Sequence, residues 1–387
     1  MVRQQQKEMN MKLNRHNTVW KGYMTGKRLL AAFLGASLLL SGCGPAGGSQ
    51  GAFDASSEEN GKLKVAVTLF PYYDFVRQIA GDQVDLQMVI PAGMDSHSFE
   101  PTPADIRTIQ HADVLISNGG TMEHWLEDTL GALDTSNMTI VTMMDYVDTV
   151  EEEIVEGMED AGHDHDHAHS HAAADDHDHS HETPEEHAAH AQEADDHDHS
   201  DYVDHDGHEE AIEYDEHIWT SPVNAMKLVD VIGETLAEAD PAHAEVFRQG
   251  AADYKKELEE IDAGFREVSR NRKRNMIVMG DKFPFRYLAD EYQLDYRAAF
   301  SGCSSDTEPS AKTIAYLIDK VKEEQIPVVY YLELSSHRVS EIIGEETGAE
   351  PLLLHSCHNV TRAQFDAGIT YAGLMRQNIE NLRKGID

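Results

Sequence analysis

Apolar positions between residues 62 and 142 follow two periodicities in turn, which predicts strands followed by helices. The segment 62–68 (Lys-Leu-Lys-Val-Ala-Val-Thr) has the two-residue alternation and the valine content of a strand. Further strands are predicted at 84–90, 114–117 and 138–142, and helices at 71–80, 102–111 and 123–130. This alternation is typical of a parallel sheet with helices on both faces.

The same pattern returns from residue 217 onward. Helices are predicted at 222–236 and 241–273, and the second is long and amphipathic. Strands are then predicted at 276–280, 327–332 and 351–354, and helices at 285–292, 310–324, 336–347 and 368–383. We therefore expect an α/β protein of two lobes, each with a mainly parallel sheet flanked by helices. The N-terminal lobe would cover 62–240, a linking helix 241–275 and the C-terminal lobe 276–387.

The segment 151–216, inside the N-terminal lobe, has no such periodicity. It contains 26 Asp and Glu and no Lys or Arg, within a chain whose formal net charge is -40. Because it has too few apolar side chains to offset the entropy of ordering, a disordered loop is predicted. The acidic charge argues against nucleic acid as a partner and favours cations.

The N-terminus has the features of an export signal. Lys27 and Arg28 precede an apolar run over 29–40, which is too short to span a bilayer and leads into Leu40-Ser41-Gly42-Cys43. Those four residues resemble the bacterial lipobox. We expect a signal peptide over 1–43 (with Met11 or Met24 as alternative starts), a lipid on Cys43 and a flexible tether over 44–61. The protein would then be extracytoplasmic and anchored to the membrane.

Two further cysteines, Cys303 and Cys357, would lie in an oxidising compartment. A disulfide between them is expected there, and a pair of thiolate metal ligands is the alternative.

The acidic segment also contains fourteen histidines between His163 and His208. Imidazole is a common ligand for zinc, copper and nickel, so this density predicts several weak, interchangeable metal sites. A disordered chain loses entropy when it forms each coordination shell, so we expect the tight site in the folded lobes.

Two histidine motifs lie in the folded lobes. His97 belongs to Gly93-Met94-Asp95-Ser96-His97-Ser98-Phe99-Glu100-Pro101-Thr102-Pro103-Ala104-Asp105, after the strand at 84–90. His217 belongs to Asp215-Glu216-His217-Ile218-Trp219-Thr220-Ser221-Pro222, directly before a helix. Ligands of doubly wound sheets bind at the carboxyl ends of the strands, where such loops lie.

These motifs resemble those of the substrate-binding proteins of zinc and manganese ABC importers. The family patterns are Asp-Pro-His followed by an aromatic residue, Glu and Pro-Thr-Pro, and Asp-Pro-His-x-Trp-x-x-Pro. The resemblance covers nearly all of 62–387, and many zinc members have a histidine-rich loop at the same place. It implies that His97 and His217 are the two metal ligands of the N-terminal lobe, facing a cleft between the lobes.

The C-terminal lobe departs from the family pattern. The family usually has His or Glu after the strand at 276–280, but strict spacing places Lys282 there, and an ammonium cannot coordinate a cation. Asp281 is therefore the expected third ligand, with helix capping as its alternative role and Glu308 as the alternative ligand. The fourth family ligand aligns best with His358, and His355 is its alternative. Three histidines with one carboxylate suit zinc, whereas a manganese site is usually richer in carboxylate.

The resemblance implies a monomeric carrier, not an enzyme. Zinc, with manganese as the alternative, would be captured and delivered to a permease and an ATPase encoded by separate chains. A zinc hydrolase would need an open coordination position and a general base, and no His-Glu-x-x-His motif occurs. The remaining alternative is a surface metal-buffering or adhesive lipoprotein, in which the loop matters and the cleft does not.

Overall fold

The computed structural model describes residue 53 and residues 61–158, 213–304 and 308–387. The predicted signal peptide, Cys43, most of the tether and the histidines from His163 to His208 lie outside these residues. Among the described helices, none combines the length and the apolar character needed to cross a membrane.

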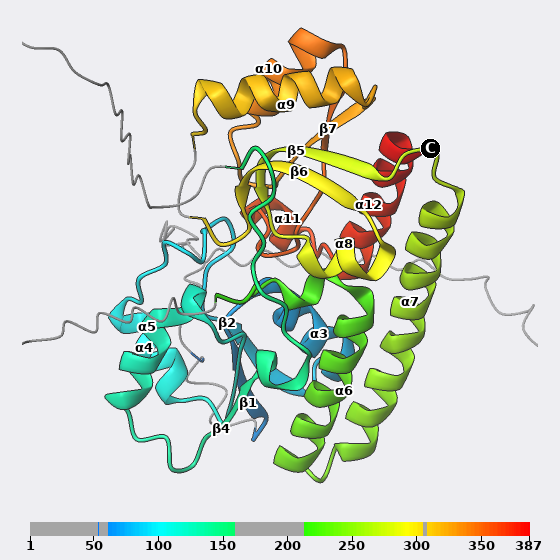
Figure 1. The fold of residues 1–387 in the computed structure, drawn as a ribbon. Coiled ribbons are helices and arrows are strands. Elements are labelled where there is room, and N and C mark those ends of the chain that lie inside the picture. Colours follow the sequence, from blue (N-terminus) through cyan, green and yellow to red (C-terminus); the bar gives the residue numbers. More distant parts are fainter. Residues whose placement is uncertain (1–52, 54–60, 159–212, 305–307) are drawn as a thin grey trace, which may run out of the picture. The chain divides into compact units, whose positions relative to one another are not determined.

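The N-terminal lobe is built on a four-stranded parallel sheet in the order β2-β1-β3-β4. Its strands are β1 (Leu63–Val67), β2 (Val84–Met88), β3 (Val114–Ser117) and β4 (Thr139–Thr142). The helices of this lobe are α3 (Phe70–Ala80), α4 (Pro103–Gln110), α5 (His124–Gly131) and α6 (Pro222–Ala239) (Figure 1). The predicted strands and helices are therefore confirmed, within two residues at most ends.

The C-terminal lobe repeats this plan with the parallel order β6-β5-β7-β8. Its strands are β5 (Met276–Phe283), β6 (Asp295–Ser301), β7 (Val328–Tyr331) and β8 (Glu350–Leu353). Its helices are α8 (Arg286–Tyr292), α9 (Ala311–Glu323), α10 (Arg338–Thr347), α11 (Arg362–Asp366) and α12 (Tyr371–Ile386). The sequence did not predict β6 or α11, and β5 is three residues longer than expected.

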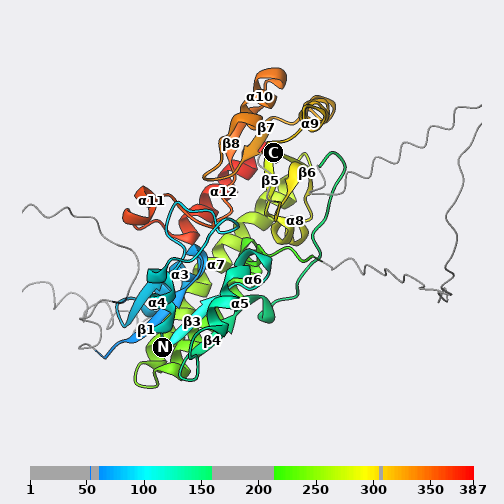
Figure 2. The same cartoon turned by 90° about the vertical axis from the view of Figure 1, so that its left-hand side faces the viewer.

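Helix α7 (Ala244–Asn271) runs along both lobes, and Figures 1 and 2 show it beside α6 and α12. It packs against α3 and α6 of the first lobe and against α12 and α8 of the second. The predicted apolar side of this helix is buried, including Tyr254, Leu258, Ile261 and Phe265. Burial of such a stripe is the main stabilising contribution of an amphipathic helix.

The residues that follow each histidine motif start a helix. Thr102 caps α4 by a capping box with Asp105, and Pro103 occupies the first turn. Ser221 caps α6 by accepting a hydrogen bond from Asn224 N, again with proline in the first turn. These caps fix the ends of the loops that carry His97 and His217.

Both ends of the acidic segment are ordered, so the predicted disordered loop 151–216 is too long. Glu151 and Tyr214 form an antiparallel bridge, and Asp215 N donates to Val150 O at 2.9 Å. The carboxylate of Glu153 forms an ion pair with Arg286 of the second lobe at 3.2 Å. Backbone pairing, an ion pair and the packing of Val155 and Met158 against the core therefore order these ends.

Candidate metal centre

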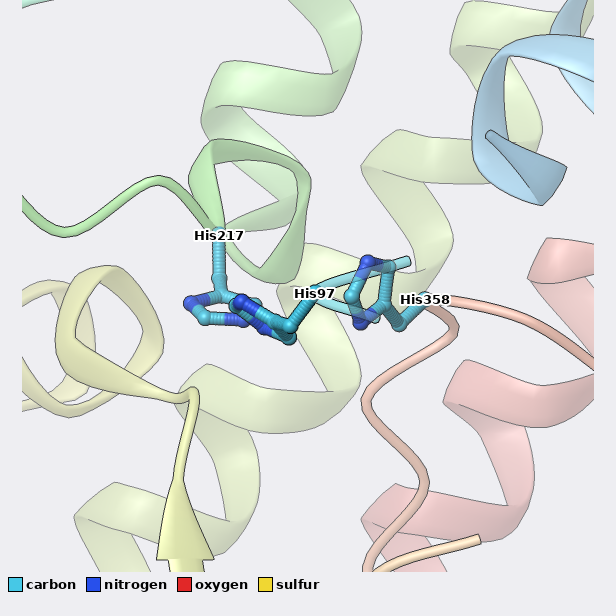
Figure 3. Close-up of side chains that lie close together, drawn as sticks. All are labelled: His97, His217 and His358. Carbon is cyan, nitrogen blue, oxygen red and sulfur yellow. The ribbon is translucent and has the colours of Figure 1, made fainter. Parts of the chain in front are cut away.

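His97, His217 and His358 converge at the edge where the two lobes meet. One ring nitrogen of each lies within 4.8 Å of the other two. The ring centroids are 5.8 Å apart for His97 and His217, and 5.4 and 5.6 Å from these two to His358. Figure 3 shows the three rings turned toward one another from three separate segments. Donor nitrogens of a tetrahedral zinc ion lie about 3.3 Å apart, so small side-chain movements would complete the site.

The backbone of each histidine is held by the same kind of hydrogen bond, to the side chain two residues earlier. The backbone N–H of His97 donates to Asp95 Oδ1 at 2.8 Å, and that of His217 donates to Asp215 Oδ1 at 2.8 Å. The backbone N–H of His358 donates to Ser356 Oγ at 3.1 Å. Asp and Ser form such turns with the residue two positions later. The recurring side-chain acceptor therefore fixes the backbone at each proposed ligand.

His217 is the most tightly fixed of the three. Its ring Nδ1 lies 3.2 Å from Asp215 Oδ1, so Nδ1 donates to the carboxylate and Nε2 is left for a metal. The carbonyl of Asp215 accepts a hydrogen bond from the Tyr287 hydroxyl at 2.7 Å. A Cβ atom at Gly302 would lie 3.3 Å from the His217 ring and 3.2 Å from Asp215, so glycine permits this close approach.

His358 belongs to the second lobe but contacts the first. Its Nε2 shares a hydrogen bond with the Ser96 hydroxyl and lies 3.0 Å from Met122 Sδ. The loop that carries it is also fixed from the first lobe, because Trp219 Nε1 donates to Ser356 O at 2.8 Å. A metal bound here would therefore be coordinated from both lobes.

Two carboxylates, one buried and one part-buried, order loops beside the centre. Glu333, which follows β7, accepts hydrogen bonds from the backbone N–H and the hydroxyl of Ser356. Glu216 accepts hydrogen bonds from the backbone N–H groups of Thr121 and Met122. Each carboxylate thus orders a loop that touches the histidine cluster.

The surroundings keep two of the three rings in the neutral form that a metal requires. Burial, with the nearby charges of His217 and Lys282, lowers the pKa of His97 to about 4. Burial, together with the smaller effect of the charges on His97 and His217, also holds the pKa of His358 well below its usual range. Burial would lower the pKa of His217 as well, but Asp215, Glu216 and Glu152 outweigh it and raise that pKa. Neutral imidazole is the ligand form, so His217 is the ring at which protons compete most with a metal.

Asp281, the expected third ligand, does not belong to the cluster that the structure brings together. One extra residue in β5, between Met279 and Lys282, forms a bulge against β6. Asp281 consequently turns toward β7, where its Oδ2 accepts from Leu332 N at 3.3 Å and its Oδ1 from Lys282 N at 2.9 Å. Lys282 lines the cavity of the centre instead. A bulge re-aims side chains in this way, and no residue pattern around it predicts the extra residue.

The two alternative ligands also lie outside the cluster. Glu308 is exposed, and His355 is buried with its Nδ1 accepting from Cys357 N at 3.0 Å. Neither belongs to the group of donors that the described residues bring together.

The expected disulfide is not present, because Cys303 and Cys357 are both free thiols. Their surroundings differ. Cys357 is buried in the turn before His358, whereas the backbone of Cys303 donates to Glu152 at 2.8 Å. Burial raises the pKa of both thiols, so neither is a ready thiolate ligand.

Sequence reasoning missed the supporting residues. Asp215 and Glu216 were part of a recognised motif but had no assigned role, and Glu333 and Met122 were not singled out. The repeated Asp or Ser two positions before each histidine is a signal that could have identified Asp215 and Ser356. Nothing in the sequence around Glu333 pointed to the loop across from it.

The folded part of the chain matches a known family and solved structures. Residues 65–385 match the family model of zinc-uptake complex component A, periplasmic. The zinc-binding protein AdcA of Streptococcus pyogenes is 33% identical over 84% of this chain and 56% of its own length. The high-affinity zinc uptake system protein ZnuA of Bacillus subtilis is 28% identical over 90% of this chain and 94% of its own.

The crystal structure of the Zn(II)-bound ZnuA-like domain of Streptococcus pneumoniae AdcA has a TM-score of 0.61 with 26% identity, covering 84% of this chain and 99% of that one. The chain spans little more than half the length of the streptococcal relatives that it matches. The match to the family model covers both lobes and all three converging histidines, and the chain therefore belongs to the family of zinc-uptake complex component A.

Proposed function

We propose that this protein is the extracytoplasmic solute-binding component of an ABC importer, which captures zinc and delivers it to a membrane permease and its ATPase. One observation carries the proposal: three imidazoles from two lobes converge on one point, with a carboxylate orienting His217. Binding from both lobes would make their interface depend on the ion. A permease could then distinguish the loaded carrier from the empty one.

The donor set favours zinc over manganese. The cluster consists of imidazole nitrogens and, among the described residues, includes no carboxylate. Imidazole suits zinc, whereas manganese prefers carboxylate, carbonyl and water oxygens. We infer that zinc is the cargo, as it is in the name of the S. pyogenes relative.

We infer a carrier and not a hydrolase, but for a different reason than the sequence suggested. Only three protein donors converge in the described residues, so coordination alone leaves a position open. A hydrolase would also need a general base beside that position. The carboxylates on the cavity wall, Asp95 and Glu333, accept hydrogen bonds from the loops of His97 and His358 instead.

The histidine-rich segment would collect zinc for the centre. His208 precedes His217 by only nine residues. In a fully extended chain nine residues span about 30 Å at most. Weak sites so close to the cleft would raise the local supply of zinc. A lipid on Cys43 would hold the carrier near its permease.

Zinc uptake under chelator limitation tests the proposal in cells that carry this chain and its partner permease. We expect His97→Ala to abolish uptake, and replacement of the fourteen segment histidines by Asn to slow it. His243, a half-exposed histidine that pairs with Asp240 and lies outside the cluster, provides the matched control, so His243→Ala should transport normally. Normal uptake with His97→Ala would contradict the proposal and favour a metal-buffering or adhesive surface protein.

A further inference from the structure

The centre contains a positively charged side chain beside the space where a cation would bind. A cavity of about 60 Å³ lies between the lobes, and its wall includes His97, His217, His358 and Lys282. Three neutral imidazoles contribute no charge, so a divalent cation would lie beside an ammonium with no anionic donor among the described ligands. Asp95 and Glu333 also line the cavity, but neither belongs to the cluster of donors, so the fourth position has no protein ligand among the described His, Cys, Asp and Glu residues.

Lys282 has no anionic partner in the part of the chain that the structure describes. Its backbone N–H donates to Asp281, but no carboxylate or carbonyl oxygen there accepts from its ammonium. Lys282 ends the bulge in β5 and lines the cavity, and its charge adds to burial in lowering the pKa of His97 and His358. The ammonium therefore acts on the same space that the histidines enclose.

Among the described His, Cys, Asp and Glu residues, no other side chain joins the three histidines in the cluster. Glu333 lines the cavity, but Ser356 N and Oγ engage its two oxygens. Asp95 accepts from the backbone of His97, and Met122 touches His358 without lining the cavity. Zinc bound by three histidines takes a fourth ligand in a tetrahedral shell.

We propose that the centre binds its cation together with a small monovalent anion from solution, such as chloride or formate. The anion occupies the fourth coordination position and accepts a hydrogen bond from the Lys282 ammonium. This inference rests on the proposed function, because it takes the three histidines as the zinc ligands. The size of the cavity limits the anion to a few atoms, since one water needs roughly 10–15 Å³ of such space.

The anion would also give the carrier a means of release. A protein carboxylate in the fourth position would remain on the protein and retain the metal. An exchangeable anion can leave together with the metal. The ammonium would then remain and repel a returning cation.

The test is the zinc affinity of the full chain in buffers of constant ionic strength, with bromide replacing a bulky sulfonate. The tight site is isolated by subtracting the titration of His97→Ala. We expect the affinity to rise with bromide. X-ray absorption at the zinc edge, with one equivalent of zinc bound, should show bromide as a neighbour of the zinc. Bromide is used because it scatters more strongly than nitrogen or oxygen.

Two substitutions and a control make the test specific. Lys282→Gln should weaken the tight site about tenfold, as loss of an outer-shell partner does, and should abolish the bromide dependence. Lys282→Glu supplies a protein carboxylate and should make the affinity tight and independent of bromide. Lys312→Gln, at an exposed lysine on α9, should behave as the unmodified chain.

The possible failures can be told apart. A tight site that ignores both bromide and Lys282→Gln would overturn the anion proposal and leave the proposed function intact. If subtracting the His97→Ala titration removes nothing, the chain has no tight site at His97, and the proposed function fails with it.

Discussion

The two lobes contribute to the centre in unequal ways. The first lobe supplies His97 and His217, each held by an aspartate two residues earlier, and a further carboxylate contact on the His217 ring. The second lobe supplies His358 and, through the bulge in β5, an ammonium. Comparable sheet topology has therefore produced one lobe organised to bind the cation and one that supplies a single ligand beside a repelling charge.

This difference shows where variation in such a site is tolerated. Helix caps and Asp turns fix the first lobe's motif residue by residue, so changes there alter ligand geometry. The bulge lies near the carboxyl end of β5, where Lys282 and not Asp281 lines the cavity. We expect substitutions in the first lobe to weaken binding most and those in β5 to adjust it.

The largest effect is expected from His217→Ala. It removes the ligand that Asp215 orients, and loss of a direct ligand should exceed the range for outer-shell partners, at about 100-fold or more in zinc affinity. Competition with a zinc chelator measures it, in a chain whose segment histidines are replaced by Asn. His243→Ala is the control, and an equal effect of the two substitutions would contradict the account.

Asp215→Asn should be the next largest, at about tenfold, because the ring of His217 loses the carboxylate charge beside its Nδ1. The pH dependence should change too. In the unmodified protein a proton competes at His217, so affinity should fall about tenfold per pH unit below its raised pKa.

His97 should add a second proton only near pH 4. In Asp215→Asn the charge that offsets burial at His217 is lost, so the pKa of His217 should be lower than in the unmodified protein. The fall in zinc affinity should then begin at a lower pH. Titrations from pH 8 to 5 would reveal this, and an unshifted onset would argue against the Asp215 contact.

Glu333→Gln should weaken zinc binding severalfold, since a carboxamide retains only one acceptor for the two donors of Ser356. The loop that carries His358 would then be less well ordered. Glu308→Gln is the matched control at an exposed glutamate. If Glu308→Gln has the larger effect, the ligand assignment in the second lobe is wrong.

The smallest effect is expected from Asp281→Asn. Its carboxylate accepts backbone hydrogen bonds from Leu332 and Lys282, and Asn can keep one of them. Zinc affinity should change by less than about threefold, with a stability loss of about 1 kcal/mol. Thermal unfolding and zinc competition should both be measured. A loss of affinity as large as that of His217→Ala would restore Asp281 as a ligand.

The sequence predicted the parts of the molecule that depend on local pattern. Periodicity located most strands and helices, and the two motifs and the alignment of the last loop identified the three converging histidines. It did not predict the bulge in β5, beside which Lys282 and not Asp281 lines the cavity. It also missed β6, whose last four residues are all buried and show no alternation.

The Cys303 and Cys357 prediction failed for a similar reason. Compartment and cysteine count indicate that a disulfide could form, but only the fold decides whether two thiols meet.

The most direct test of the account is a zinc titration of the chain with the fourteen segment histidines replaced by Asn. The account predicts one tight equivalent, which is lost on replacing any one of His97, His217 or His358 by Ala. Absence of a tight equivalent, or one that survives all three substitutions, would contradict the central claim that the two lobes form the zinc site together.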